Sequence, residues 1–97
     1  MKAEFTSFSK DSNWVDGVVG EYKFQAKLFD EGSEYGINGG RVSKLSIRKK
    51  RTMQEKSDFL SDCIVNYDRG WDIEPKEEYT ECYNAVMELL ENSPKRF

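Results

Sequence analysis

The sequence contains no histidine, and this absence excludes several kinds of catalytic site. Neither a Ser-His-Asp triad nor a Cys-His pair can form, and a zinc site that contains histidine is equally impossible. The commonest general base near neutral pH is missing as well. An enzyme built on this chain would have to use carboxylates, lysines or tyrosines alone. We therefore predict a non-enzymatic protein without a cofactor or a metal ion.

Long hydrophobic runs and cysteines are also scarce. No stretch approaches the roughly 18–20 apolar residues that cross a bilayer, and the start, Met1–Phe5, lacks the apolar run of a signal peptide. The chain has two cysteines, Cys63 and Cys82, which in the absence of an export signal we expect to be reduced and partly buried. These features predict a cytoplasmic protein that does not interact with membranes.

Aromatic residues, by contrast, are plentiful for so short a chain. They make up 13% of its 97 residues, and each can supply a large buried area. A chain of this length supports one hydrophobic core rather than two. We predict a single domain over residues 13–97, preceded by a flexible arm over residues 1–12. This arm would instead be a short edge strand if Phe5 and Phe8 dock on the domain.

Alternation of apolar and polar residues predicts about four β-strands. The predicted strands cover residues 14–19, 22–29, 41–51 and 63–67. The second is the clearest, because every even-numbered residue from Tyr22 to Leu28 is apolar and every odd-numbered one is polar. In the third, Val42 falls on the polar side, so the register at its start is either undetermined or bulged.

One amphipathic helix is predicted near the end of the chain. Pro75 suits the first helical position, and the acidic residues that follow it would interact favourably with the positive, N-terminal end of the helix dipole. Apolar residues then recur at three- and four-residue spacing as far as Leu90, and Asn92–Pro94 should end the helix. The expected fold is α+β, an antiparallel sheet of about four strands with this helix packed on one face.

A glycine-rich segment separates the second and third predicted strands. Its spacing fits neither phosphate-binding pattern, since no Gly-x-x-x-x-Gly-Lys-Ser/Thr is present and no Gly-x-Gly-x-x-Gly opens a helix. We predict a structured turn, with Tyr35 and Ile37 directed inward.

Charge is segregated along the chain, although the net value is only −3. Residues 41–51 hold six basic residues and no acid, whereas residues 72–91 hold seven acids and one lysine. Antiparallel pairing of the two alternating strands would gather lysines and arginines on the exposed sheet face. Arg69 and Trp71 belong to residue types that are frequent at binding hot spots. The predicted binding surface consists of Lys23, Lys27, Lys44, Arg48, Lys50, Arg69 and Trp71.

Three functions fit these observations. The leading hypothesis is a module that binds a protein partner through one of its charged faces. The first alternative is a nucleic-acid-binding accessory protein that uses the basic sheet face, although this face lacks the interleaved aromatic residues of single-strand binders. The second is a small enzyme that depends on carboxylates. A simpler explanation also exists, because lysines commonly solvate a strand face and Trp71 can cap the core.

Several segments resemble a family of small uncharacterised proteins from Gram-positive bacteria and their phages. The likeness covers residues 14–90 and is carried by Trp14, Tyr22–Lys27, Ser33–Ile37, Gly40–Leu45 and Asn66–Asp72. The chain departs from the family pattern at Lys50–Cys63, where the connection between strands is longer. The resemblance implies no activity and no site residue. It does imply a setting in which small accessory proteins bind and modulate host proteins, for example by inhibiting a defence nuclease.

Overall fold

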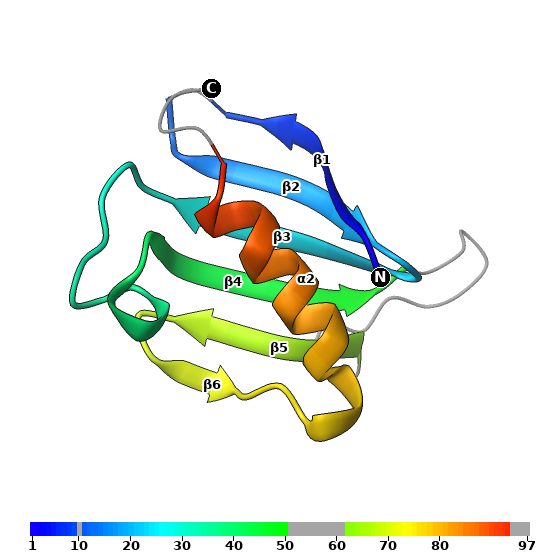
Figure 1. Ribbon diagram of the computed structural model, residues 1–97. Coiled ribbons are helices and arrows are strands. Elements are labelled where there is room, and N and C mark those ends of the chain that lie inside the picture. Colours follow the sequence, from blue (N-terminus) through cyan, green and yellow to red (C-terminus); the bar gives the residue numbers. More distant parts are fainter. Residues whose placement is uncertain (10, 51–61, 94–97) are drawn as a thin grey trace.

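A single antiparallel sheet forms the body of the molecule (Figure 1). The computed structural model describes residues 1–9, 11–50 and 62–93. The sheet has six strands in sequence order, β1 (Ala3–Phe8), β2 (Trp14–Val19), β3 (Tyr22–Leu28), β4 (Val42–Lys49), β5 (Cys63–Asp68) and β6 (Trp71–Ile73). The short 3-10 turns are η1 (Ile37–Gly39) and η2 (Glu77–Tyr79), and the second leads into the helix α2 (Thr80–Glu91). The predicted α+β class is confirmed.

The expected number of strands was too low, because the sheet has six rather than four. The four predicted strands are β2 to β5, and the two additional ones lie at the edges. In β1, Ala3 is buried and Phe5 packs against the core, whereas the last three residues are exposed, so its apolar alternation is too short to be recognised in the sequence. β1 lies within the predicted flexible arm, where it pairs with β2 and packs Phe5 against the core. The first residues therefore form the edge strand that was the alternative to a flexible arm. β6 is only three residues long.

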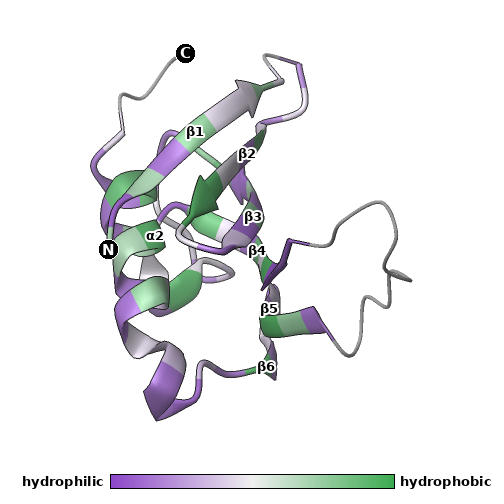
Figure 2. Ribbon diagram, turned by 90° about the vertical axis from the view of Figure 1, so that its right-hand side faces the viewer, coloured by the Kyte–Doolittle hydropathy of each residue, from purple (hydrophilic) through white to green (hydrophobic). Residues whose placement is uncertain are grey.

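The hydrophobic core lies between one sheet face and the helix, which crosses that face diagonally (Figure 1). Figure 2 shows the same arrangement from the side, with α2 lying along one side of the sheet. Val15, Ala26 and Leu45 occupy one row across three neighbouring strands, and all are buried. From the helix, Val86 and Leu90 face this layer and are fully buried. Their four-residue spacing is what places them on the same side of α2.

The helix begins at Thr80 rather than at the predicted Pro75. Lys76 is extended, with φ −71° and ψ 160°, and the chain then forms the 3-10 turn η2. The ring of Tyr79, at the end of this turn, packs edge-on against Tyr22 on β3, with 6.0 Å between the centroids. The chain must travel from the sheet edge to the helical layer before it can wind, so the helical signal of Pro75 is overridden by tertiary packing.

Of the two possibilities left open at the start of β4, the structure shows the bulge. Leu28 lies opposite Val42 and Lys27 lies opposite Lys44, so β4 has one additional residue there. That residue, Ser43, is buried. Because of it, Val42 points into the core while Lys44 stands on the opposite face.

A polar clamp joins the end of the helix to the start of β4. The backbone N–H of Arg41 donates to Oε1 of Glu91 at 2.9 Å. The guanidinium of Arg41 donates through Nη1 to the carbonyl oxygens of Glu91 at 3.2 Å and Ser93 at 2.8 Å, and through Nε to that of Phe29 at 2.8 Å. Carbonyl groups that the helix itself leaves unpaired are thereby satisfied.

Substitution of Glu91 by alanine should therefore destabilise the fold. The variant leaves a partly buried N–H of Arg41 without its carboxylate, and hydrogen bonds to charged groups contribute about 1.5–3 kcal/mol each. We expect the free energy of unfolding in urea to fall by about that amount. Glu88→Ala, an exposed residue on the same helix, is the matched control and should change it by less than about 0.5 kcal/mol. Equal losses in both variants would contradict the clamp.

Candidate functional site

The sheet face opposite the helix carries four of the seven predicted binding residues. Lys23 lies opposite Arg48, and Lys27 lies opposite Lys44. The antiparallel pairing expected from the sequence is thus confirmed. Gln25 and Ser46, which are polar but uncharged, lie opposite each other between these two pairs. The four basic residues therefore form two separate pairs, one toward each end of the strands.

Acidic residues from other strands share this face. Asp68 lies opposite Lys44, with its Oδ1 3.6 Å from the lysine Nζ. Asp16 lies opposite Gln25 and accepts a hydrogen bond from Ser7 Oγ at 3.0 Å. Sequence reasoning missed these acids, because their strands show no run of like charges. The face is therefore mixed in charge rather than uniformly basic.

Two predicted binding residues do not join this face. Lys50 follows the end of β4, and its Nζ donates to the carbonyl oxygen of Gly20 at 3.3 Å, near the turn between β2 and β3. Trp71 pairs with Tyr67 on the helix side of the sheet, and its ring lies 5.0 Å from that of Tyr67 and 5.9 Å from that of Tyr83. With 38% of its surface exposed, Trp71 covers the edge of the core.

The remaining predicted residue, Arg69, meets Lys27 and Lys44 at one corner of the sheet. Here the loop between β3 and β4 approaches the turn between β5 and β6. The three cationic side chains, together with Phe29 and Tyr35, border an open pocket of about 780 Å³. We call this hollow the corner pocket. The described residues that line it are Asn13, Lys27, Phe29, Asp30, Glu31, Gly32, Ser33, Tyr35, Ser43, Lys44 and Arg69.

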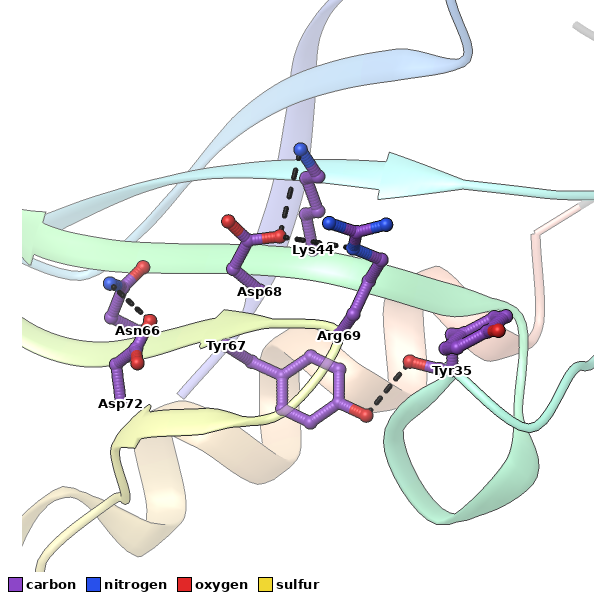
Figure 3. A network of polar contacts seen from close by, with 7 residues as sticks. All are labelled: Tyr35, Lys44, Asn66, Tyr67, Asp68, Arg69 and Asp72. Carbon is purple, nitrogen blue, oxygen red and sulfur yellow. Dashed lines mark hydrogen bonds and ion pairs between the residues drawn. The ribbon is translucent and has the colours of Figure 1, made fainter.

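Figure 3 shows the polar contacts beside the corner pocket. A single carboxylate oxygen, Oδ1 of Asp68, is shared by Lys44 Nζ at 3.6 Å and Arg69 Nε at 3.8 Å. In the part of the chain that the structure describes, Lys27 has no ion pair. Its ammonium instead lies 5.6 Å from the centroid of the Phe29 ring, within the range of a cation–π contact.

The loop that carries Tyr35 is held in place by its own hydrogen bonds and by the sheet. Tyr67 Oη donates to the carbonyl oxygen of Tyr35 at 2.8 Å, and Ser33 N–H donates to Gly40 at 3.2 Å. A Cβ atom at Gly36 would overlap the carbonyl oxygen of Gly40, so this close approach requires glycine. The structured turn is confirmed.

Of the two side chains expected to point inward from this loop, only one does. Ile37 is buried with 2% of its surface exposed, whereas Tyr35 is 53% exposed. The backbone of Tyr35 is tied to Tyr67, and its ring is therefore displayed beside the corner pocket. Neither Tyr35 nor Phe29 was among the predicted binding residues. Tyr35 lies in an irregular loop, which has no periodicity that assigns side chains to a face, and Phe29 was the last residue of a predicted strand.

Backbone strain is found on two sides of the corner pocket. Arg69 has φ +56° and Asn13 has φ +62°, both in the left-handed region. Asparagine tolerates this region, but for arginine it is uncommon. The N–H of Arg69 donates to the carbonyl oxygen of Ser43 at 3.0 Å, which anchors the turn to β4. Strained residues of this kind tend to cluster at functional sites.

The cysteines do not offer a reactive group. Cys63 and Cys82 form no disulfide, and both are buried, whereas the sequence predicted only partial burial. Burial raises the pKa of each thiol, which keeps it in the unreactive protonated form near neutral pH.

Two kinds of feature are absent from the part of the chain that the structure describes. No group of three or more cysteines and acids among residues 1–9, 11–50 and 62–93 is arranged to hold a metal ion. Within the same ranges, no helix combines the length and the apolar character required to cross a membrane.

Residues 13–91 match the model of a family described as a domain of unknown function (DUF7678). The chain belongs to this family. The match runs from the residue before β2 to the end of α2, and it includes all the described residues that line the corner pocket. It agrees with the resemblance to an uncharacterised family seen in the sequence. No curated protein and no solved structure matches the chain.

Proposed function

We propose that this protein is a non-enzymatic interaction module that binds a partner protein at the corner pocket. The observation that carries the proposal is the grouping of two exposed aromatic rings, Phe29 and Tyr35, with the exposed Arg69 around one pocket. Aromatic residues and arginine are enriched at protein interfaces and supply most of the binding energy there. Single exposed apolar residues are common on any surface, but a cluster around a hollow is typical of a contact site.

The hydrogen bonds of the loop support this proposal. Binding costs free energy when a loop must be ordered, and this cost falls when the loop is already held in one conformation. The contacts of Tyr67 with Tyr35 and of Ser33 with Gly40 hold the loop in this way. The aromatic rings are thus displayed on a pre-organised support.

The distribution of charge favours a protein over a nucleic acid as the partner. Phosphates would meet not only the basic pairs but also Asp16 and Asp68 on the same face, and Asp30 and Glu31 at the corner pocket. Nucleic-acid affinity depends mainly on cations that neutralise phosphates. Neighbouring charges of both signs are instead suited to a complementary protein surface, where they contribute to specificity.

The proposal includes a cellular setting. A small accessory protein, encoded by a phage or by its bacterial host, would act in the cytoplasm by covering a surface of a larger protein, such as a defence protein that it inhibits. The two unpaired thiols, Cys63 and Cys82, fit a reducing compartment.

Substitution of Tyr35 by alanine tests the proposal. The tagged full-length protein is used to isolate its partner from the source cell, and the affinity for that purified partner is then measured by calorimetry. We expect Tyr35→Ala to weaken binding by at least about tenfold, because truncation of a central aromatic residue commonly has that effect. Tyr35→Phe should retain most of the affinity, since the ring remains.

Glu34→Ala is the matched control for this experiment. Glu34 is exposed and adjacent to Tyr35 but does not line the corner pocket, so its removal should leave the affinity within about twofold. The proposal is wrong if the partner binds Tyr35→Ala and Phe29→Ala as tightly as the unaltered protein.

A further inference from the structure

Three cationic side chains, Lys27, Lys44 and Arg69, line the corner pocket beside the acids Asp30 and Glu31. Within the described residues, Lys44 and Arg69 share one oxygen of Asp68, whereas the Lys27 ammonium has no ion pair and lies 5.6 Å from the centroid of the Phe29 ring. Lys27 and Lys44 are direct cross-strand neighbours, and like charges in such positions repel. A second carboxylate placed between them would relieve this repulsion.

Some of the hydrogen-bond donors of Arg69 are available to a ligand. Its ion pair with Asp68 uses Nε, and its two terminal nitrogens have no hydrogen bond within the described part of the chain. A guanidinium presents its donors as a planar fork that matches the two oxygens of a carboxylate. At 65% side-chain exposure, the fork of Arg69 is accessible from solvent.

We infer that the corner pocket receives the carboxylate of an acidic side chain of the partner protein, held between Lys27, Lys44 and Arg69. This inference rests on the proposed function, since it specifies what the interaction site recognises. Asp68 illustrates the arrangement, because it is a carboxylate of the chain itself that two of these three cations already share. The rings of Phe29 and Tyr35 also border the pocket and can contact the aliphatic part of the incoming side chain.

A carboxylate fits this site better than a phosphate. Asp30 and Glu31 also line the corner pocket and would repel an incoming anion. Attraction by the three cations and repulsion by the acids both grow in proportion to the ligand charge and offset one another. The cost of removing the ligand from water grows with the square of its charge, so a phosphate, with a charge of about −1.5 to −2 at pH 7, is disfavoured more strongly than a singly charged carboxylate.

The test is a titration of the full-length protein, labelled with nitrogen-15 and followed by NMR. The probes are the blocked tripeptide acetyl-Gly-Glu-Gly-amide, its Gln counterpart and inorganic phosphate, all at one fixed ionic strength. We expect the Glu peptide to shift the amide resonances of Lys27, Lys44 and Arg69 in a saturable manner. The Gln peptide should not shift them, and phosphate should bind more weakly than the Glu peptide.

Lys27→Gln should weaken binding of the Glu peptide by about two- to fivefold, which is the range for one partly exposed ion pair. Lys27→Arg should largely retain it. Lys23→Gln is the matched control, because Lys23 is an exposed lysine on the same strand and the same face but pairs with Arg48 at the other end. It should leave the affinity unchanged.

Several results would overturn the inference. Equal shifts with the Glu and Gln peptides would show that the carboxylate is not recognised, and equal losses in Lys27→Gln and Lys23→Gln would indicate attraction by net charge alone. Tighter binding of phosphate, or of a short single-stranded DNA, would assign the site to a phosphate-bearing ligand. If the peptide fails to bind while Tyr35→Ala still loses the partner, only the carboxylate assignment fails. If the peptide binds but Tyr35→Ala retains the partner, the proposed function fails instead.

Discussion

Replacement of Gly17 by valine should cost more than about 3 kcal/mol of unfolding free energy, which is a large part of the stability of a small domain. Gly17 lies on the core side of β2, where it is paired with Phe5 on one neighbouring strand and Phe24 on the other. A Cβ atom there would overlap both the ring of Phe24 and the backbone carbonyl oxygen of Glu4. The ring could move, but the carbonyl belongs to β1 and can shift only if the two strands separate.

Urea unfolding followed by tryptophan fluorescence measures this effect. Val18→Thr is the matched control, because Val18 is the next residue along β2, is half-buried on the opposite face, and keeps its branched shape in the variant. It should change the unfolding free energy by less than about 1 kcal/mol. Gly17→Ala, which adds the Cβ alone, should lose about 1–3 kcal/mol and remain measurable if the valine variant does not fold. An unchanged urea midpoint for Gly17→Ala would contradict the close approach of the strands.

Replacement of Leu90 by alanine should lower the unfolding free energy by about 2–5 kcal/mol. The Leu90 side chain is fully buried between α2 and the sheet, in the same core cluster as Val86 and Ile37. Its truncation removes apolar contacts and leaves a cavity that rigid strands on the other side cannot fill. The loss should be visible both in the urea midpoint and in the melting temperature followed by circular dichroism.

The neighbouring Leu89 provides the control for this prediction. Leu89 is only partly buried and lines the open groove between α2 and β1. Leu89→Ala removes the same atoms at a site that is already open to solvent, so its cost should be at most about half that of Leu90→Ala. A larger loss for Leu89→Ala than for Leu90→Ala would mean that α2 turns Leu89, rather than Leu90, toward the core.

Part of the candidate site was predictable from local alternation. The side chains of a strand point alternately to its two faces, so the grouping of Lys23 with Lys27, and of Lys44 with Arg48, follows from covalent geometry. The pairing of these two strands then brought the four residues to one face. Arg69 was recognised by its residue type. Its position beside Lys44 depends on the turn between β5 and β6, which the sequence predicts without placing.

Other parts of the site depend on residues that are distant in the sequence. Asp68 balances Lys44 because β5 pairs with β4, and Tyr35 is displayed because Tyr67 holds its backbone. Trp71, one of the predicted binding residues, lies at the core edge, since its position on the helix side of β6 directs it toward Tyr83. Such contacts join segments more than ten residues apart, and no local periodicity encodes them.

The absence of histidine, the alternation in four strands and the apolar side of the helix were determined by the sequence alone. These properties depend on composition or on the geometry of consecutive residues, which tertiary contacts do not alter. Only the tertiary structure decided that edge strands extend the sheet to six, that the helix begins at Thr80, and that acids share the exposed face with the lysines. Each of these outcomes depends on contacts between segments that are distant in the sequence, and no local pattern specifies which segments meet.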